Sequence, residues 1–172
     1  MGQVIEGGAL EAALAAVKAY VRVEGTGEDA VLGAMTASAV EMCEAFIGQW
    51  LVARDGSEAV ERGVRWQRLK ARPVVAIMGV EPLVMGAFEI DIDADGCGWV
   101  RLLEETAEVP RALFRAGMAA EWGGLPEALR HGIVRLAAHL YAARDGAGNG
   151  APPAVVTALW RPYRHILFGR AS

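Results

Sequence analysis

The chain has 172 residues, of which 53% are hydrophobic and 22% charged. This composition is close to that of ordinary globular proteins, so it excludes a wholly disordered, collagen-like or low-complexity chain, and the length suits a single domain with its own core. The net charge of -4 offers no basic field to hold nucleic acid, so stable duplex binding is not expected.

Two helices are predicted at the start of the chain. The first, about twelve residues long, presents one apolar face made of Leu10, Leu14, Val17 and Val21. Thr26 precedes Asp29 by three residues, a capping-box pattern that would start the second helix near Glu28. Gly48 would end that helix, because glycine tolerates a left-handed conformation. Its apolar stripe is Leu32, Met35, Ala39, Met42 and Phe46, with the methionines as core fillers.

From Gln49 the pattern changes to short β-branched or aromatic runs between turn residues. The runs are QWLVAR, DGSEAVERG and VRWQRL. Pro73 and Pro82 bracket VVAIMGV, an apolar run that favours a buried strand. A last strand, ALFRAGMA, follows Pro110, and Trp122-Gly123-Gly124 forms an exit loop. The region 49–122 is therefore predicted to be rich in strands.

The segment AFEIDID gives the clearest strand signal. Phe88, Ile90 and Ile92 alternate with acidic residues, which predicts one buried and one wet face. Asp95-Gly96 would then form a hairpin turn. DIDADG also has the acidic spacing of a calcium loop, but its twelfth position is Leu102 instead of glutamate and strands flank it. We therefore favour the hairpin.

Two further helices are predicted near the end of the chain. The long one spans Pro126 to Gly146 and has an apolar face made of Leu129, Ile133, Leu136 and Leu140. Its opposite, polar side carries Glu127, Arg130, His131 and Arg135. After a glycine-rich loop, Pro152 and Pro153 suit the first turn of a short helix. The apolar side of that helix is Val155, Val156, Leu159 and Trp160.

These elements predict an α+β fold within a single domain over residues 1–172. It is mainly a helical bundle of two N-terminal helices, one long C-terminal helix and a short last helix, with a small antiparallel strand-rich insertion.

No catalytic or cofactor motif stands out in the sequence. Nucleotide-binding glycine motifs and a nucleophile elbow are absent, and His131 and His139 have no nearby carboxylate that would suggest a metal site. Cys43 and Cys97 match no ligand spacing and suggest buried free thiols in a reducing cytoplasm. No secretory signal or run of about eighteen apolar residues is present. We therefore expect a non-enzyme with no cofactor, no metal and no membrane contact.

The order of features resembles the head-to-tail connector, or adaptor, proteins of long-tailed phages and gene transfer agents. The resemblance rests on three segments and spans nearly the whole chain. They are ALEAALAAVKAYVRVEGTGEDAVLGAMTASAVEMCEAFIG, the strand and turn EIDIDADG, and LPEALRHGIVRLAAHLYAARDG with VVTALWRPYR. The chain departs from the pattern in its YVRV segment, in the irregular region from Arg54 to Pro82, and in the long glycine-rich loop before Pro152.

The resemblance implies a structural subunit of the particle neck. About a dozen copies would form a ring below the portal protein, extend the DNA channel, and hold the next neck or tail protein, a stopper or tail terminator. DNA would pass through without sequence-specific binding. Assembly would take place in the bacterial cytoplasm, and the finished ring would lie in the neck of the phage or phage-like particle.

The C-terminal tail 161–172 then becomes a candidate docking segment, because its aromatic and arginine side chains are typical of interface hot spots. The candidate portal or neighbour contacts are Trp160, Arg161, Tyr163, Arg164, Ile166, Leu167, Phe168 and Arg170. The segment after Pro162 would dock on the portal ring and become ordered on binding. The alternative is that these residues fold back on the subunit's own core.

Two other functions fit the sequence. The chain could be a small regulatory or ligand-binding α+β domain with an apolar pocket between the long helix and the sheet, or an enzyme without a recognisable motif. A stable monomer or dimer with a bound metabolite would favour the regulatory domain, and rings or portal-dependent assembly would favour the connector.

Overall fold

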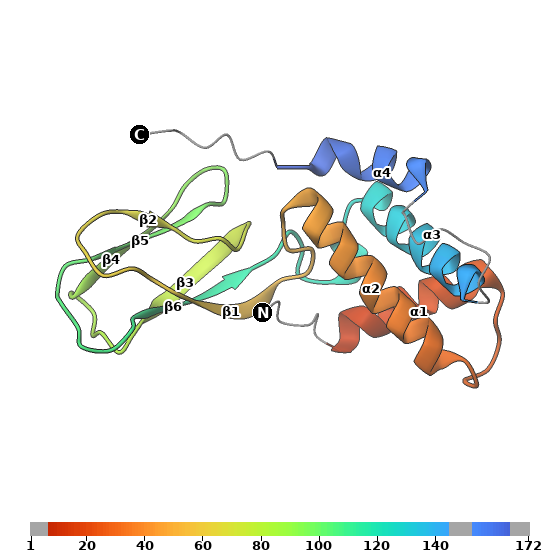
Figure 1. Ribbon diagram of the computed structural model, residues 1–172, viewed down its shortest axis with the longest axis horizontal. Coiled ribbons are helices and arrows are strands. Elements are labelled where there is room, and N and C mark those ends of the chain that lie inside the picture. Colours follow the sequence, from red (N-terminus) through yellow and green to blue (C-terminus); the bar gives the residue numbers. More distant parts are fainter. Residues whose placement is uncertain (1–6, 145–152, 166–172) are drawn as a thin grey trace. The chain divides into compact units, whose positions relative to one another are not determined.

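A computed structural model describes residues 7–144 and 153–165 (Figure 1). The chain divides into two compact units. Residues 49–120 form the first, which we call the sheet unit, and the described residues before and after them form the second, the helical unit. Helices and antiparallel sheets together confirm the predicted α+β class.

The helical unit contains the four predicted helices. Two come first in the chain, α1 (Gly7–Val21) and α2 (Asp29–Ile47). The short 3-10 helix η1 (Trp122–Gly124), in place of the predicted exit loop, leads into α3 (Glu127–Ala143). The last are α4 (Ala154–Trp160) and the 3-10 helix η2 (Arg161–Tyr163). Pro153 immediately precedes α4, as its fixed backbone angle favours.

Helix α2 ends as predicted but begins differently. Gly48 adopts a left-handed conformation with φ of 70° and donates its N–H to the carbonyl of Glu44. The predicted capping box is wrong, since no side chain caps the helix start at Glu28. Asp29 instead accepts a 2.5 Å bond from the Lys18 ammonium group. An ion pair with α1 therefore replaces the cap.

The buried face of α2 is shifted by part of a turn from the predicted stripe. Its fully buried positions are Leu32, Thr36, Ala39, Val40, Cys43 and Ile47. Met35, Met42 and Phe46 lie half-buried at the margin of that face. The buried Thr36 hydroxyl donates to the Leu32 carbonyl at 2.7 Å, so a polar side chain is satisfied within its own helix. The predicted stripe shares Leu32 and Ala39 with this face and differs at Thr36, because hydropathy does not indicate that a threonine is buried.

Helix α3 is the centre of the helical unit, since it contacts α1, α2 and α4. Leu129, Ile133 and Leu136 are fully buried, as predicted. Arg130 and Arg135 differ from the prediction, because both are half-buried instead of lying on a wet face. Long arginine stems cover neighbouring apolar surface while the charged groups stay near solvent.

Helix α2 is long and apolar enough to cross a membrane, judged by length and composition only. Its mean hydropathy reaches 1.4 over an 18-residue window. It packs against α1 and α3 and contributes six buried positions to the unit. This is the pattern of a core helix in a small bundle.

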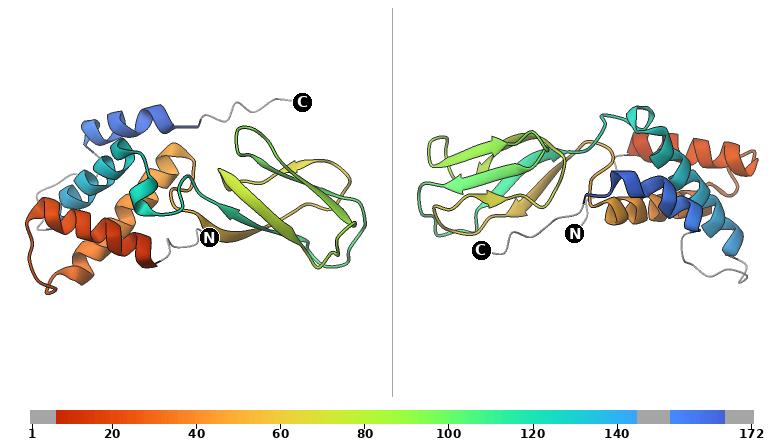
Figure 2. Two further views of the ribbon diagram at one scale, coloured as in Figure 1. Left: turned by 180° about the vertical axis from the view of Figure 1, so that it is seen from behind. Right: turned by 90° about the horizontal axis from the view of Figure 1, so that it is seen from above.

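The sheet unit contains two antiparallel sheets of three strands each (Figure 2). In the first, β6 (Arg111–Ala116) is central between β1 (Arg54–Ala59) and β3 (Val74–Glu81). In the second, β5 (Gly98–Leu102) is central between β2 (Gln67–Arg68) and β4 (Phe88–Ile92). Both sheets contribute to one core, which includes Val74, Val80, Phe88, Val100, Leu102, Ala112 and Phe114.

Both strands form, but the predicted burial of β3 and β4 is confirmed for only part of each strand. Each is an edge strand, so one side has no neighbouring strand to cover it. The register of β3 against β6 shifts at Val75 and again at Met78, and both side chains are more than half exposed. In β4, Phe88 is buried while Ile90 and Ile92 lie exposed at the strand edge. Edge position therefore overrides the apolar pattern.

The turn between β4 and β5 confirms the hairpin and not the calcium loop. Gly96 has φ of 71° and donates its N–H to the Asp93 carbonyl. The Asp93 carboxylate accepts bonds from the N–H of Asp95, the N–H of Cys97 and the indole N–H of Trp99. Its oxygens are thus committed to closing the turn.

Candidate protein interface

The last helix, α4, delivers Trp160 into the helical unit. The side chain is 1% exposed, and its ring centroid lies 5.9 Å from that of Phe46. Its indole also lies against Gly132 of α3, where a side chain would collide with it. Trp160, one of the predicted interface residues, therefore lies in the core of the subunit, as the fold-back alternative expects for this position.

The next residues reach the surface. Arg161 and Arg164 are exposed and Tyr163 is half-buried. The Arg164 guanidinium carbon lies 5.6 Å from the centroid of the Phe46 ring, within the range of a cation–π contact. These three side chains from η2 and the residue after it form a small aromatic and basic surface, which we call the η2 surface.

The end of the described chain is held against α2. The His165 N–H donates to the Ile47 carbonyl at 2.9 Å, beside the C-terminal end of that helix. Four other predicted contacts, Ile166, Leu167, Phe168 and Arg170, lie outside the described residues. The structure therefore fixes where the last seven residues begin.

Charge is unevenly distributed over the helical unit. Acidic residues outnumber basic ones in α1, α2 and their linker, whereas basic residues outnumber acidic ones from α3 to η2. An ion pair links the two parts at Glu28, which accepts a 3.0 Å bond from Arg144 and another bond from the Tyr141 hydroxyl. Glu11, Glu41 and Arg161 are exposed and form no ion pair with the other described residues.

A second candidate surface lies on the loops of the sheet unit. It exposes five large apolar side chains, which we call the loop surface: Val64, Val84, Met85, Leu103 and Val109. Their exposed fractions run from 45% for Leu103 to 83% for Met85. Hydrogen bonds join the loops, since the backbone N–H groups of Leu103 and Glu104 donate to the Ala87 carbonyl and the Arg62 guanidinium donates to the Ala107 carbonyl. A group of exposed apolar side chains of this kind marks an interaction site.

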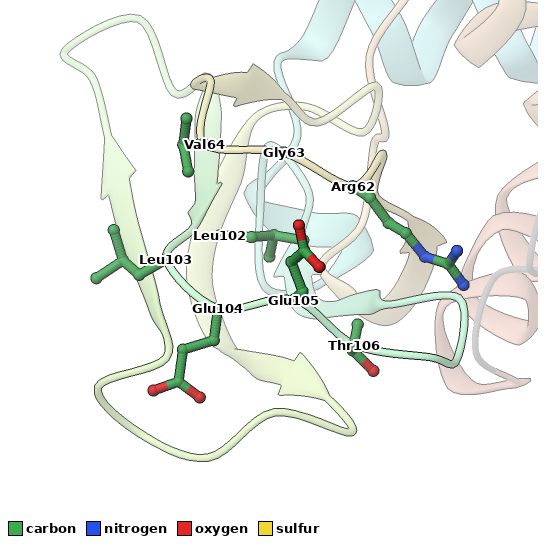
Figure 3. A pocket seen from close by; sticks show the side chains of 8 residues that line it. All are labelled: Arg62, Gly63, Val64, Leu102, Leu103, Glu104, Glu105 and Thr106. Carbon is green, nitrogen blue, oxygen red and sulfur yellow. The ribbon is translucent and has the colours of Figure 1, made fainter.

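A pocket of about 310 Å³ opens within the loop surface (Figure 3). Val64, Leu102 and Leu103 supply apolar lining, and Glu104 and Glu105 add two carboxylates. The Arg62 guanidinium extends away from Leu103 and Val64 (Figure 3). No motif in the sequence predicts this site. The one sequence signal for it is the pair Leu102-Leu103 followed by Glu104-Glu105 at the end of a strand.

Titratable side chains in the two units have structural roles. The hydrogen bond from Trp99, with the backbone bonds at the turn, lowers the pKa of Asp93. Burial raises the pKa of the Cys43 thiol and, together with the Asp93 charge, that of Cys97, although Arg72 acts in the opposite direction on Cys97. Both cysteines are free and buried, as predicted. Among the described residues no group of histidine, cysteine or acidic side chains could hold a metal ion.

No protein-family model and no curated protein sequence matches the chain. Solved structures do match it over nearly its whole length, and we describe three of them. One is from the neck of an empty GTA particle computed with C6 symmetry, with 22% identity, a TM-score of 0.73 and 98% coverage of both chains. A second is from the virion of a native gene transfer agent (GTA) particle, with 26% identity, a TM-score of 0.72 and coverage of 98% of this chain and 97% of that chain.

The third is from the neck of a native GTA particle computed with C12 symmetry, with 23% identity and a TM-score of 0.74. The match covers 99% of this chain and 100% of that chain, so the helical unit and the sheet unit are both included. The chain therefore has the fold of neck proteins of gene transfer agent particles, which supports the resemblance to the head-to-tail connector family.

Proposed function

We propose that this protein is a connector subunit that forms a ring of about twelve copies below the portal of a phage-like particle. The ring extends the DNA channel, joins the capsid to the tail, and presents its far side to a stopper or tail terminator. The role is structural and involves no catalysis.

The observation that carries this proposal is the match to neck chains over at least 98% of this sequence. A fold shared over both units, without a large insertion or deletion, favours a shared architectural role more than a match limited to one unit would. The C6 and C12 symmetries of the two neck structures are consistent with a subunit that repeats around the particle axis.

The electrostatics agree with a DNA channel. A subunit with net charge of -4 does not grip phosphates, so a ring of such subunits lets DNA slide. The uneven charge of the helical unit also fits a ring. In a heterologous ring each copy meets its two neighbours through different faces, and faces of opposite charge are complementary.

We assign the portal contact to the η2 surface, Arg161, Tyr163 and Arg164. Arginine and tyrosine are enriched at interface hot spots, and both arginines are exposed. Trp160 positions this surface, because its buried indole packs α4 against α2 and α3.

Co-purification with the portal protein of the same particle tests the assignment. The Arg161→Glu/Arg164→Glu variant should keep its helical circular dichroism spectrum and lose incorporation into portal-containing particles. Arg68→Glu, which reverses an exposed charge on β2, serves as the matched control and should be incorporated normally. Unchanged incorporation of the double variant would refute the η2 surface as the portal contact.

A further inference from the structure

The pocket in the loop surface combines apolar lining with unneutralised negative charge. Glu104 and Glu105 are exposed, and neither carboxylate has an ion pair or hydrogen bond within the part of the chain that the structure describes. Leu103, next to them, is 45% exposed despite its apolar side chain. Exposed leucine beside free carboxylates suggests a surface that is completed by another chain.

The chemistry of the pocket defines its ligand. Val64, Leu102 and Leu103 would contact one or two large apolar side chains. The Glu105 carboxylate extends toward Leu102, whereas that of Glu104 points the opposite way (Figure 3). Glu105 would pair with a cation that follows the apolar side chains in the ligand, and arginine suits this role because its guanidinium can bind a carboxylate in a bidentate manner. The matching ligand is a short peptide with an apolar run followed by arginine.

The end of this chain has that sequence. Residues 166–170 read Ile-Leu-Phe-Gly-Arg, and Arg170 is the single charged side chain after His165. The segment starts at a fixed point, because the His165 N–H is bonded to the Ile47 carbonyl. The seven residues that follow it in the sequence span at most about 25 Å when extended.

We propose that the pocket lined by Leu103, Glu104 and Glu105 receives segment 166–170 of a second copy of the chain. The apolar residues of the segment fill the pocket, and Arg170 pairs with Glu105, while Glu104 adds negative charge nearby. The segment and the pocket are two different surfaces on one subunit, which is the requirement for a head-to-tail ring contact. The inference rests on the proposed ring and supplies a contact between neighbouring subunits, distinct from the portal contact of the η2 surface.

Peptide binding tests the pocket directly. A fluorescent peptide of residues 165–172 is titrated against a chain that ends at His165, and fluorescence anisotropy is measured. Saturable binding is expected, with affinity weakened about tenfold or more by Leu103→Asp. The matched control is Val75→Asp, which adds a charge at an exposed apolar residue on β3 and should leave the affinity unchanged. Absent binding, or equal binding by the Leu103→Asp variant, would overturn the proposal.

A charge exchange tests the pairing of Arg170 and does not depend on the apolar substitution. A peptide with Arg170→Glu should bind the unmodified pocket about tenfold more weakly. The same peptide should regain affinity for a Glu104→Arg/Glu105→Arg chain, whereas the natural peptide should lose it. Failure of this exchange would refute the assigned ion pair.

A mixing experiment tests whether the tail enters a second copy. The Leu103→Asp chain keeps its tail but lacks the pocket, and the chain ending at His165 keeps its pocket but lacks the tail. Each alone should remain monomeric in sedimentation velocity, and the mixture should form heterodimers. Monomers in the mixture, despite peptide binding, would contradict the intermolecular contact. If the heterodimers form but the unmodified chain is not incorporated into portal-containing particles, the proposed function fails while the contact between subunits stands.

Discussion

Replacing Gly132 with alanine should loosen the contact between α3 and α4. A Cβ atom at this position would lie 2.1 Å from Nε1 of Trp160 and 2.9 Å from two further atoms of the indole. The indole cannot move aside easily, because Trp160 is 1% exposed and packs on Phe46. Helix α4 would have to shift, and the η2 surface would move with it.

The magnitude follows from two opposing effects. In an open helix position, alanine stabilises the helix relative to glycine by about 1 kcal/mol. Overpacking of a filled core costs about 1–3 kcal/mol. Because the buried indole would have to shift to admit the Cβ atom, the cost of overpacking outweighs the gain, and we expect a net loss of up to about 2 kcal/mol in the free energy of unfolding.

Urea unfolding followed by far-ultraviolet circular dichroism measures this loss. The matched control is Gly33→Ala in α2, where no atom lies within 4 Å of an added Cβ and a gain of up to about 1 kcal/mol is expected. Trp160→Phe should partly rescue Gly132→Ala, because it removes the colliding Nε1. A Gly132→Ala variant as stable as Gly33→Ala would refute the described packing of α4 on α3.

Three further results are expected. Gly117→Ala should destabilise the sheet unit by about 3 kcal/mol or more in thermal unfolding, because φ is 152° and the added Cβ would lie 2.3 Å from the Ala53 backbone; native-like stability would contradict this contact. The bond from Trp99 holds the pKa of Asp93 below its ordinary value, so stability from this group is full above about pH 4 and is lost as pH falls through the lowered pKa. Asp93→Asn should remove this acid-induced loss of stability, and a variant whose stability depends on pH as the unmodified chain's does would contradict the role given to Asp93. Cys43 should react with a thiol reagent at the rate of unfolding, since burial raises the pKa of its thiol; rapid labelling of the native chain would disagree.

The helices were largely predictable because their signals are local. The leucine and isoleucine spacing in α3, Gly48 at the end of α2 and Pro153 before α4 act through neighbouring residues of the same segment. The start of α2 was not predictable in the same way. Asp29 binds Lys18 from another helix, and sequence spacing contains no information on that contact.

The strands formed as predicted at β3 and β4, but their burial depends on their neighbours in the sheets. An apolar run such as VVAIMGV has the same local pattern in a central or an edge strand, and its edge position leaves Val75 and Met78 exposed. The pocket could not be predicted from the sequence for the same reason. Val64 and Leu103 are 39 positions apart in sequence, and the fold brings their loops together.

The candidate interface could be predicted in composition and not in geometry. The aromatic and arginine content of the chain end suggested a contact surface, but composition does not distinguish Trp160, which is buried, from Arg161, which is exposed. The helical period shows which of the two side chains is buried only when the helices that pack against α4 are known.

Native mass spectrometry of the full chain, alone and mixed with the portal protein of its particle, tests the proposed function most directly. We predict a closed ring of about twelve copies that forms at high protein concentration or on the portal. A monomer or dimer that persists at all concentrations and with the portal present, particularly with a bound small molecule, would contradict it.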